Sequence, residues 1–272
     1  MAHVRYPSPD GPRPDYSETA APAAKAPTVK TITTDTVRSA LRKGFDDFKA
    51  APGYGLFFGG VYVVGGLLLW ALSRMVGNAG VLVPLAFAFP LLGPFLAIGL
   101  YEVSRRREAG EPLDKSAILG AVFRQRDGQM PFMGVVILFL ALCWLVLARV
   151  TFALFLSNDA MTNIFTTREA IFTLDGIVML LIVTGLGAAF ALLVFSITVV
   201  SMPLLLDREI DVVTATITSV QAVIENLRPM MIWAAIVVAM LVVAMLPAFL
   251  GLFIALPVLG HGTWHLYRAV VD

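Results

Sequence analysis

Long uninterrupted apolar stretches constrain the fold of this chain more than any other feature of its sequence. About 20 apolar residues in a helix span the hydrocarbon core of a bilayer, which is roughly 30 Å thick. Of the 272 residues, 58% are hydrophobic and only 14% are charged, whereas soluble domains have about a quarter charged residues. The apolar stretches cover, in rough bounds, residues 54–75, 81–103, 131–155, 174–206 and 230–270.

The last of these stretches is long enough to form two spans. Pro247 and Gly251 lie near its middle, where a tight turn would separate span five from span six. The alternative is one broken helix followed by a re-entrant segment. The sequence therefore predicts an all-α fold, a polytopic transmembrane helical bundle of about six spans.

The distribution of lysine and arginine predicts the orientation in the membrane. Cytoplasmic loops of membrane proteins carry an excess of these residues. With six spans, 17 of the 20 fall on one side and only Arg74, Arg149 and Arg168 on the other. We therefore predict a bacterial inner-membrane protein with both termini in the cytoplasm. Residues 1–34 are rich in proline and have no apolar run typical of a secretion signal, so we expect a disordered cytoplasmic tail before a transmembrane domain at 35–272.

A short amphipathic segment ending near a proline precedes each pair of spans. Asp35 and Asp207 are candidate caps for the first and third segments, and Asp114 precedes the second. We expect three interfacial helices on the cytoplasmic face. The apolar positions at helical spacing are Val37, Leu41, Phe45 and Phe48 in the first, Ile118 and Val122 in the second, and Ile210, Val213, Ile217, Val220, Ile224 and Leu227 in the third.

The ends of the first and third span pairs have matching sequences. Residues 94–105 and 257–268 both contain proline, leucine, a small residue, glycine, an aromatic residue, an acid or histidine, and then arginine. The middle pair lacks this ending, so we interpret the chain as a degenerate triplication. Its units would be 35–110, 111–206 and 207–272, each a hairpin with its interfacial helix, and the two matching endings would lie at the same depth.

Four sequence blocks carry a resemblance to a known family. They are residues 44–48, 94–110, 203–208 and 259–268. Together they resemble the proteobacterial integral membrane proteins grouped as domain of unknown function 2189, over roughly residues 35–270. The resemblance implies six helices, a loose association with the respiratory chain, and no established activity.

Two histidines are the candidate metal or haem ligands. His261 and His265 are spaced i, i+4, so one helical face could present both imidazoles to a metal. Neither a cysteine nor a carboxylate nearby in sequence completes a ligand set, although the pseudo-symmetry would bring Glu102 close. The alternative is that both histidines form hydrogen bonds at the end of the last span. The single Cys143 allows no disulfide framework.

A basic run at the end of the second span is the candidate site for a headgroup or a partner. Arginine binds phosphate with two hydrogen bonds, so this run could hold an anionic lipid headgroup or a partner protein. The alternative is that the arginines only fix the topology. The candidate residues are Glu102, Arg105, Arg106 and Arg107, with Trp264, Tyr267 and Arg268 as anchors at the matching end.

Three function classes remain open. The interpretation that we favour is a non-catalytic accessory, assembly or scaffolding component of a membrane complex, because no nucleophile with a base, phosphate loop or metal motif is visible. A transporter or channel for a small or lipidic solute would need a water-filled cavity that reaches the bilayer midplane. A haem or metal protein would use His261 and His265. The expected partners are the lipid bilayer, anionic headgroups and other membrane subunits, with no nucleic acid and no bound cofactor.

Overall fold

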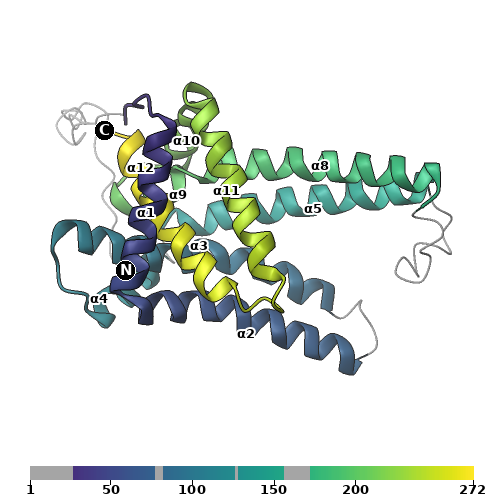
Figure 1. Ribbon diagram of the computed structural model, residues 1–272, viewed down its shortest axis with the longest axis horizontal. Helices are drawn as coiled ribbons and strands as arrows, with labels where there is room; N and C mark the ends of the chain where they lie inside the picture. Colours follow the sequence, from purple (N-terminus) through teal and green to yellow (C-terminus); the bar gives the residue numbers. More distant parts are fainter. Residues whose placement is uncertain (1–26, 77–81, 126–127, 156–171) are drawn as a thin grey trace, which may run out of the picture.

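The computed structural model describes residues 27–76, 82–125, 128–155 and 172–272. Over these residues the fold is all-helical and confirms the predicted helical bundle (Figure 1). One isolated bridge, between Val29 and Val271, is the only extended pairing in the described residues. The helices are α1 (Thr34–Ala50), α2 (Pro52–Val76), α3 (Leu82–Ala109), α4 (Lys115–Arg124), α5 (Met130–Phe155), α8 (Leu174–Thr198), α9 (Ser201–Asp207), α10 (Val212–Glu225), α11 (Leu227–Met245) and α12 (Leu252–Val270).

The three expected amphipathic segments are helices α1, α4 and α10, and each one precedes a pair of long helices. Asp114 accepts a hydrogen bond from the Ala117 amide at 3.1 Å and caps α4. The other two predicted caps are wrong, by two and by four residues. Helix α1 begins after Thr33, and helix α10 begins after Asp211, whose Oδ1 accepts from the Thr214 amide at 2.9 Å. Several polar residues precede each helix, and sequence alone does not tell which of them lies beside the free amides.

Four helical segments in the described part of the chain are long and apolar enough to cross a membrane. They lie in α2, α5, α8 with α9, and α11. Helices α3 and α12 occupy the positions of the second and sixth predicted spans but are not among these four, so the number six stays a prediction. Helix α12 carries His261, His265 and Arg268, which lower its hydropathy. Between α11 and α12 the chain turns back near Ala248 and Phe249, whose φ angles of 50° and 66° are left-handed. The predicted reversal between Pro247 and Gly251 is therefore observed.

Helices α1 and α12 cross with their backbones in contact and lie side by side (Figure 1). A Cβ atom on Gly44 would lie 2.5 Å from the backbone nitrogen of Gly262 and 2.6 Å from the carbonyl oxygen of Val258. Only glycine at position 44 permits this approach. The crossing joins the beginning and the end of the transmembrane domain.

The last part of the expected disordered tail has defined contacts. Residues 1–26 lie outside the described residues, but the Lys30 amide donates to the Val270 carbonyl at 2.8 Å. The Ile32 amide donates to Oδ1 of Asn226 at 2.7 Å, and the Ile32 side chain is buried. The order in residues 27–33 comes from backbone pairing with the end of α12 and from the Asn226 side chain, neither of which local composition reveals.

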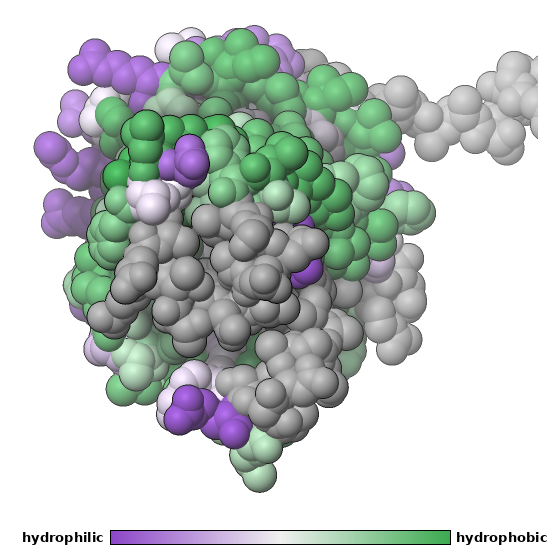
Figure 2. Space-filling view, turned by 90° about the vertical axis from the view of Figure 1, so that its right-hand side faces the viewer, coloured by the Kyte–Doolittle hydropathy of each residue, from purple (hydrophilic) through white to green (hydrophobic). Residues whose placement is uncertain are grey.

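Helices α5 and α8 form an arm that extends away from the other helices (Figure 1). The central hydrophobic core takes residues from α5 only between Met130 and Ile137, and from α8 only at its last turn, beginning at Phe195. Beyond these points the two helices pack on each other, and a Cβ atom on Gly187 of α8 would lie 3.1 Å from Nε1 of Trp144 on α5. We call residues 138–155 and 174–194 the arm. Figure 2 looks at the molecule from the side on which the arm ends, and hydrophobic side chains cover much of the coloured surface there.

Candidate functional site

A largely buried polar cluster joins α1, α3 and α12 at the end of the molecule opposite the tip of the arm. The cluster consists of Asp47, Ser104, Arg107, His261 and His265. Oδ2 of Asp47 accepts hydrogen bonds from Ser104 Oγ at 2.6 Å and from His265 Nε2 at 2.8 Å. Oδ1 of the same carboxylate accepts from Arg107 Nε at 2.8 Å. Asp47 thus ties helix α1 to both α3 and α12.

Ser104 lies between Asp47 and His261. Its Oγ is 2.8 Å from Nδ1 of His261. Because the one hydroxyl hydrogen is donated to the carboxylate, Oγ accepts from Nδ1–H of the imidazole. This order of groups differs from a nucleophilic serine site, in which the histidine lies between the acid and the serine and takes the hydroxyl proton. In this arrangement Ser104 links Asp47 on α1 to His261 on α12.

The Asp47 carboxylate stays charged although it is buried. Burial by itself would raise the pKa of Asp47, but the hydrogen bonds from His265 and Ser104 outweigh this effect, so the pKa lies below its usual value. Hydrogen bonds that involve a charged group are stronger than neutral ones. The negative charge of Asp47 therefore lies between the three helices, paired with the guanidinium of Arg107.

The basic run at the end of α3 is occupied with ion pairs inside the protein. Glu102 is buried and accepts from Arg105 at 2.8 and 3.0 Å and from Arg106 at 2.7 Å. Arg105 also reaches Glu111 at 3.2 Å. With Arg107 bound to Asp47, all three arginines have acidic partners. The geometry therefore does not favour the expected binding of an anionic headgroup by these three residues.

The predicted anchors Trp264 and Tyr267 are buried inside the protein, so the packing does not favour their contact with lipid headgroups, which stays a prediction. Trp264 Nε1 donates to Glu108 Oε2 at 3.0 Å, and the Tyr267 hydroxyl donates to Asp207 Oδ2 at 2.6 Å. Arg268 lies 3.3 Å from Glu108 and 3.4 Å from Asp207. Carboxylates from α3 and α9 satisfy the polar atoms of both aromatic side chains, which allows the rings to pack inside the protein.

The two histidines do not converge on a common point. His265 binds Asp47, and His261 binds Ser104. The carboxylate that approaches them is Asp47 on α1, whereas the expected Glu102 binds arginines. In the described residues no group of three or more His, Cys, Asp or Glu side chains is arranged to hold a metal. His261 Nε2 and Trp233 Nε1 are buried without a hydrogen-bond partner among the same residues.

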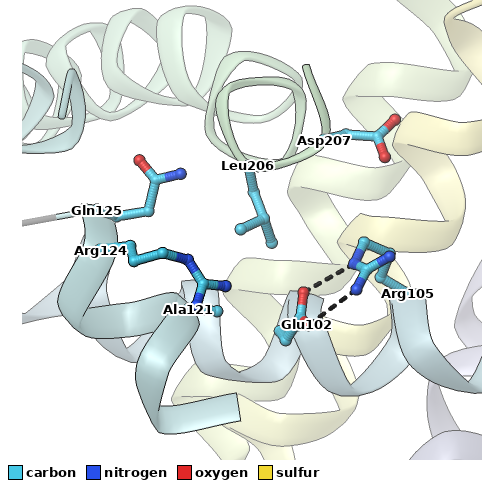
Figure 3. A pocket seen from close by; sticks show the side chains of 7 residues that line it. All are labelled: Glu102, Arg105, Ala121, Arg124, Gln125, Leu206 and Asp207. Atoms are coloured by element: carbon cyan, nitrogen blue, oxygen red, sulfur yellow. Dashed lines mark hydrogen bonds and ion pairs between the residues drawn. The ribbon is translucent and has the colours of Figure 1, made fainter. Parts of the chain in front are cut away.

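Several cavities lie between the described helices. A polar cavity of about 250 Å³ lies between α3, α4 and α9 (Figure 3). An apolar cavity of about 230 Å³ lies between α2, α3, α11 and α12. A third, about 440 Å³ and also mainly apolar, lies between the beginning of α2 and helix α4.

The site residues predicted from the sequence lie at the end of the molecule that holds the polar cluster, but the prediction did not include four polar residues of this region. They are Asp47, Ser104, Glu108 and Asp207, whose partners are 57 to 218 positions away. All four lie in blocks that carry the family resemblance, at residues 44–48, 94–110 and 203–208. A polar residue inside such a block, next to a span, is the signal that could have identified them.

The fold and the polar cluster define a polytopic helical integral membrane protein. Residues 82–207 match the family described as predicted integral membrane protein (DUF2189). This segment runs from α3 to α9 and includes Ser104, Glu108 and Asp207, and it confirms the resemblance there. No curated protein and no solved structure matches the chain.

Proposed function

We propose that this protein is a non-catalytic component of a membrane complex in the bacterial inner membrane, and that its α5–α8 arm binds a different membrane protein. The observation that carries the proposal is the separation of the arm from the core. Little of the apolar stretch of each arm helix is buried inside the protein, 17% for α5 and 6% for α8. Lipid can cover such a surface, but helix association in membranes depends on close packing, and the arm offers both of its helices for it.

The polar cluster supports a structural role. Its carboxylate, hydroxyl, guanidinium and imidazole groups bind one another and hold α1, α3 and α12 in fixed positions. A rigid base, formed by α1, α3 and α12 around the polar cluster, and a projecting pair of helices suit a subunit that organises neighbouring membrane proteins. Under this proposal the base lies on the cytoplasmic side, where the sequence places most of the lysine and arginine.

Site-specific photo-crosslinking in cells tests the proposal. A photoreactive amino acid replaces Leu181, which is exposed in the first half of α8, and in a matched strain it replaces Leu68, which is exposed on α2. We expect one heterologous membrane protein to crosslink at position 181 and not at position 68. Adducts with lipid alone at both positions would refute the proposal. Adducts with a second copy of this chain would show that the arm forms a homo-oligomer instead.

A second candidate is the binding or passage of a lipidic solute. The apolar cavity between α2, α3, α11 and α12 is lined by Leu96, Leu241 and Leu256 among others. Such a lining suits an acyl chain better than a hydrated solute. Vesicles that contain the purified protein should then exchange a fluorescent lipid between leaflets faster than empty vesicles, and equal rates would exclude this candidate.

A further inference from the structure

The polar cavity between α3, α4 and α9 contains charged groups of both signs. Glu102 and Asp207 line it together with Arg105 and Arg124, and Gln125 adds an amide (Figure 3). The four charged side chains balance, two against two. A ligand with only negative charge would meet two carboxylates there, and a ligand with only positive charge would meet two guanidinium groups.

Two of these groups keep free binding capacity. Arg124 forms no ion pair or hydrogen bond with the part of the chain that the structure describes, and its guanidinium points toward the cavity (Figure 3). Asp207 accepts from Tyr267 and Arg268 through Oδ2, and Oδ1 has no partner in the described residues. Glu102 and Arg105 bind each other and are therefore part of the wall.

The position of the cavity is that of a lipid headgroup. Arg124 ends helix α4, whose Leu119 and Phe123 side chains are exposed on an amphipathic helix of the kind that lies at a membrane surface. Asp207 ends the apolar segment Leu174–Asp207. Leu206 supplies an apolar wall between the two charged groups. At about 250 Å³ the cavity is smaller than the 300–1,000 Å³ typical of sites for drug-sized ligands.

We propose that this cavity binds the headgroup of a zwitterionic phospholipid of the phosphatidylethanolamine type. The phosphate accepts hydrogen bonds from Arg124, with the Gln125 amide beside it, and the ammonium group donates to Oδ1 of Asp207. Arginine recognises phosphate through its fork of donors, and a carboxylate is the matching partner for an ammonium group. The proposal differs from the expected anionic headgroup, because the three arginines of the basic run are occupied. It does not depend on what the arm binds.

Native mass spectrometry of the full-length protein in mild detergent tests the site. The protein is titrated with phosphatidylethanolamine, with phosphatidylglycerol and with soluble glycerophosphoethanolamine. We expect phosphatidylethanolamine to bind most tightly, and Arg124→Gln to weaken it about tenfold through the loss of a charged hydrogen bond. Arg42→Gln is the matched control, because Arg42 is exposed on α1 away from the cavity. This control should bind like the wild type.

Each other outcome overturns a defined part of the proposal. Equal or tighter binding of phosphatidylglycerol would refute the pairing of Asp207 with an ammonium group. Equal binding of glycerophosphoethanolamine would assign the cavity to a soluble ligand and refute the lipid. Unchanged affinity in Arg124→Gln would refute the site. Asp207→Asn also disturbs the hydrogen bond with Tyr267, so the lipid preference of this variant is compared with that of Tyr267→Phe, which removes the same hydrogen bond. Only Asp207→Asn should lose the preference for the ethanolamine headgroup.

Discussion

Replacing Gly44 with alanine should separate helices α1 and α12. The new Cβ would lie 2.5, 2.6 and 2.8 Å from three backbone atoms of α12. Backbone atoms cannot turn away as a flexible side chain can, so the helices themselves have to move. Overpacking of this kind costs about 1–3 kcal/mol, and contacts with backbone place this substitution near the upper value.

Two further effects change this estimate in opposite directions. Alanine is favoured over glycine inside a helix by about 1 kcal/mol. Asp47 lies one turn further along α1, and a shift of the helix would weaken its bonds to His265 and Ser104, each worth about 1.5–3 kcal/mol when fully formed. We therefore expect Gly44→Ala to lower the free energy of unfolding by about 3 kcal/mol.

Unfolding in mixed micelles with increasing sodium dodecyl sulfate, followed by circular dichroism, measures this change. Gly53→Ala is the matched control, because a Cβ atom at this helical glycine would meet nothing within 4 Å. The control should be unchanged or more stable by up to about 1 kcal/mol. If Gly44→Ala unfolds within about 0.5 kcal/mol of the wild type, the two backbones are not in contact and the reasoning is refuted.

Three other predictions concern the polar side chains. Asp47→Asn should lower the free energy of unfolding by about 3 kcal/mol in the same assay, because the buried side chain loses its charged hydrogen bonds with Ser104 and His265. Asp46→Asn, at an exposed neighbour, should change it by less than about 0.5 kcal/mol, and equal effects would contradict the buried cluster. Because the pKa of Asp47 is lowered by folding, the stability that it adds is present at neutral pH and is lost as the pH falls below about 4. The wild type should therefore lose more stability than Asp47→Asn when chemical unfolding is compared at pH 6 and pH 3, and parallel losses would argue against a charged Asp47. Tyr267→Phe should destabilise the protein by about 1.5–3 kcal/mol through the bond to Asp207, and a thermal unfolding curve identical to that of the wild type would show that this bond adds nothing.

Much of the helical architecture follows from the sequence because it depends on local patterns. Periodic apolar residues and the following prolines placed α1, α4 and α10 before their long helices. The turn near Ala248 followed from the length of one apolar stretch and the proline in its middle. Such signals need only neighbouring residues, so a single sequence contains them.

The contacts of the site depend on residues that are distant in sequence, and these were not predictable in the same way. Nothing around Asp47 indicates that Ser104 and His265 will surround it, 57 and 218 positions away. Trp264 and Tyr267 have the composition of interfacial anchors, but carboxylates from α3 and α9 allow both to be buried. Which residues face the protein and which face lipid is decided by packing between helices, because both surroundings are apolar.

The crossing of α1 and α12 also has a consequence for biosynthesis. The residues that bond across it, Asp47 and His265, are separated by 218 positions. At about 5–20 residues per second, a ribosome needs roughly 10–40 s to make the chain between them. Helix α1 is therefore synthesised before its packing partner α12. The surface around Gly44 stays uncovered by α12 while the intervening helices are inserted. Closure of this crossing is then a late event in the maturation of each molecule, and chains that stop before α12 present an uncovered α1 to the proteases and chaperones of the cell.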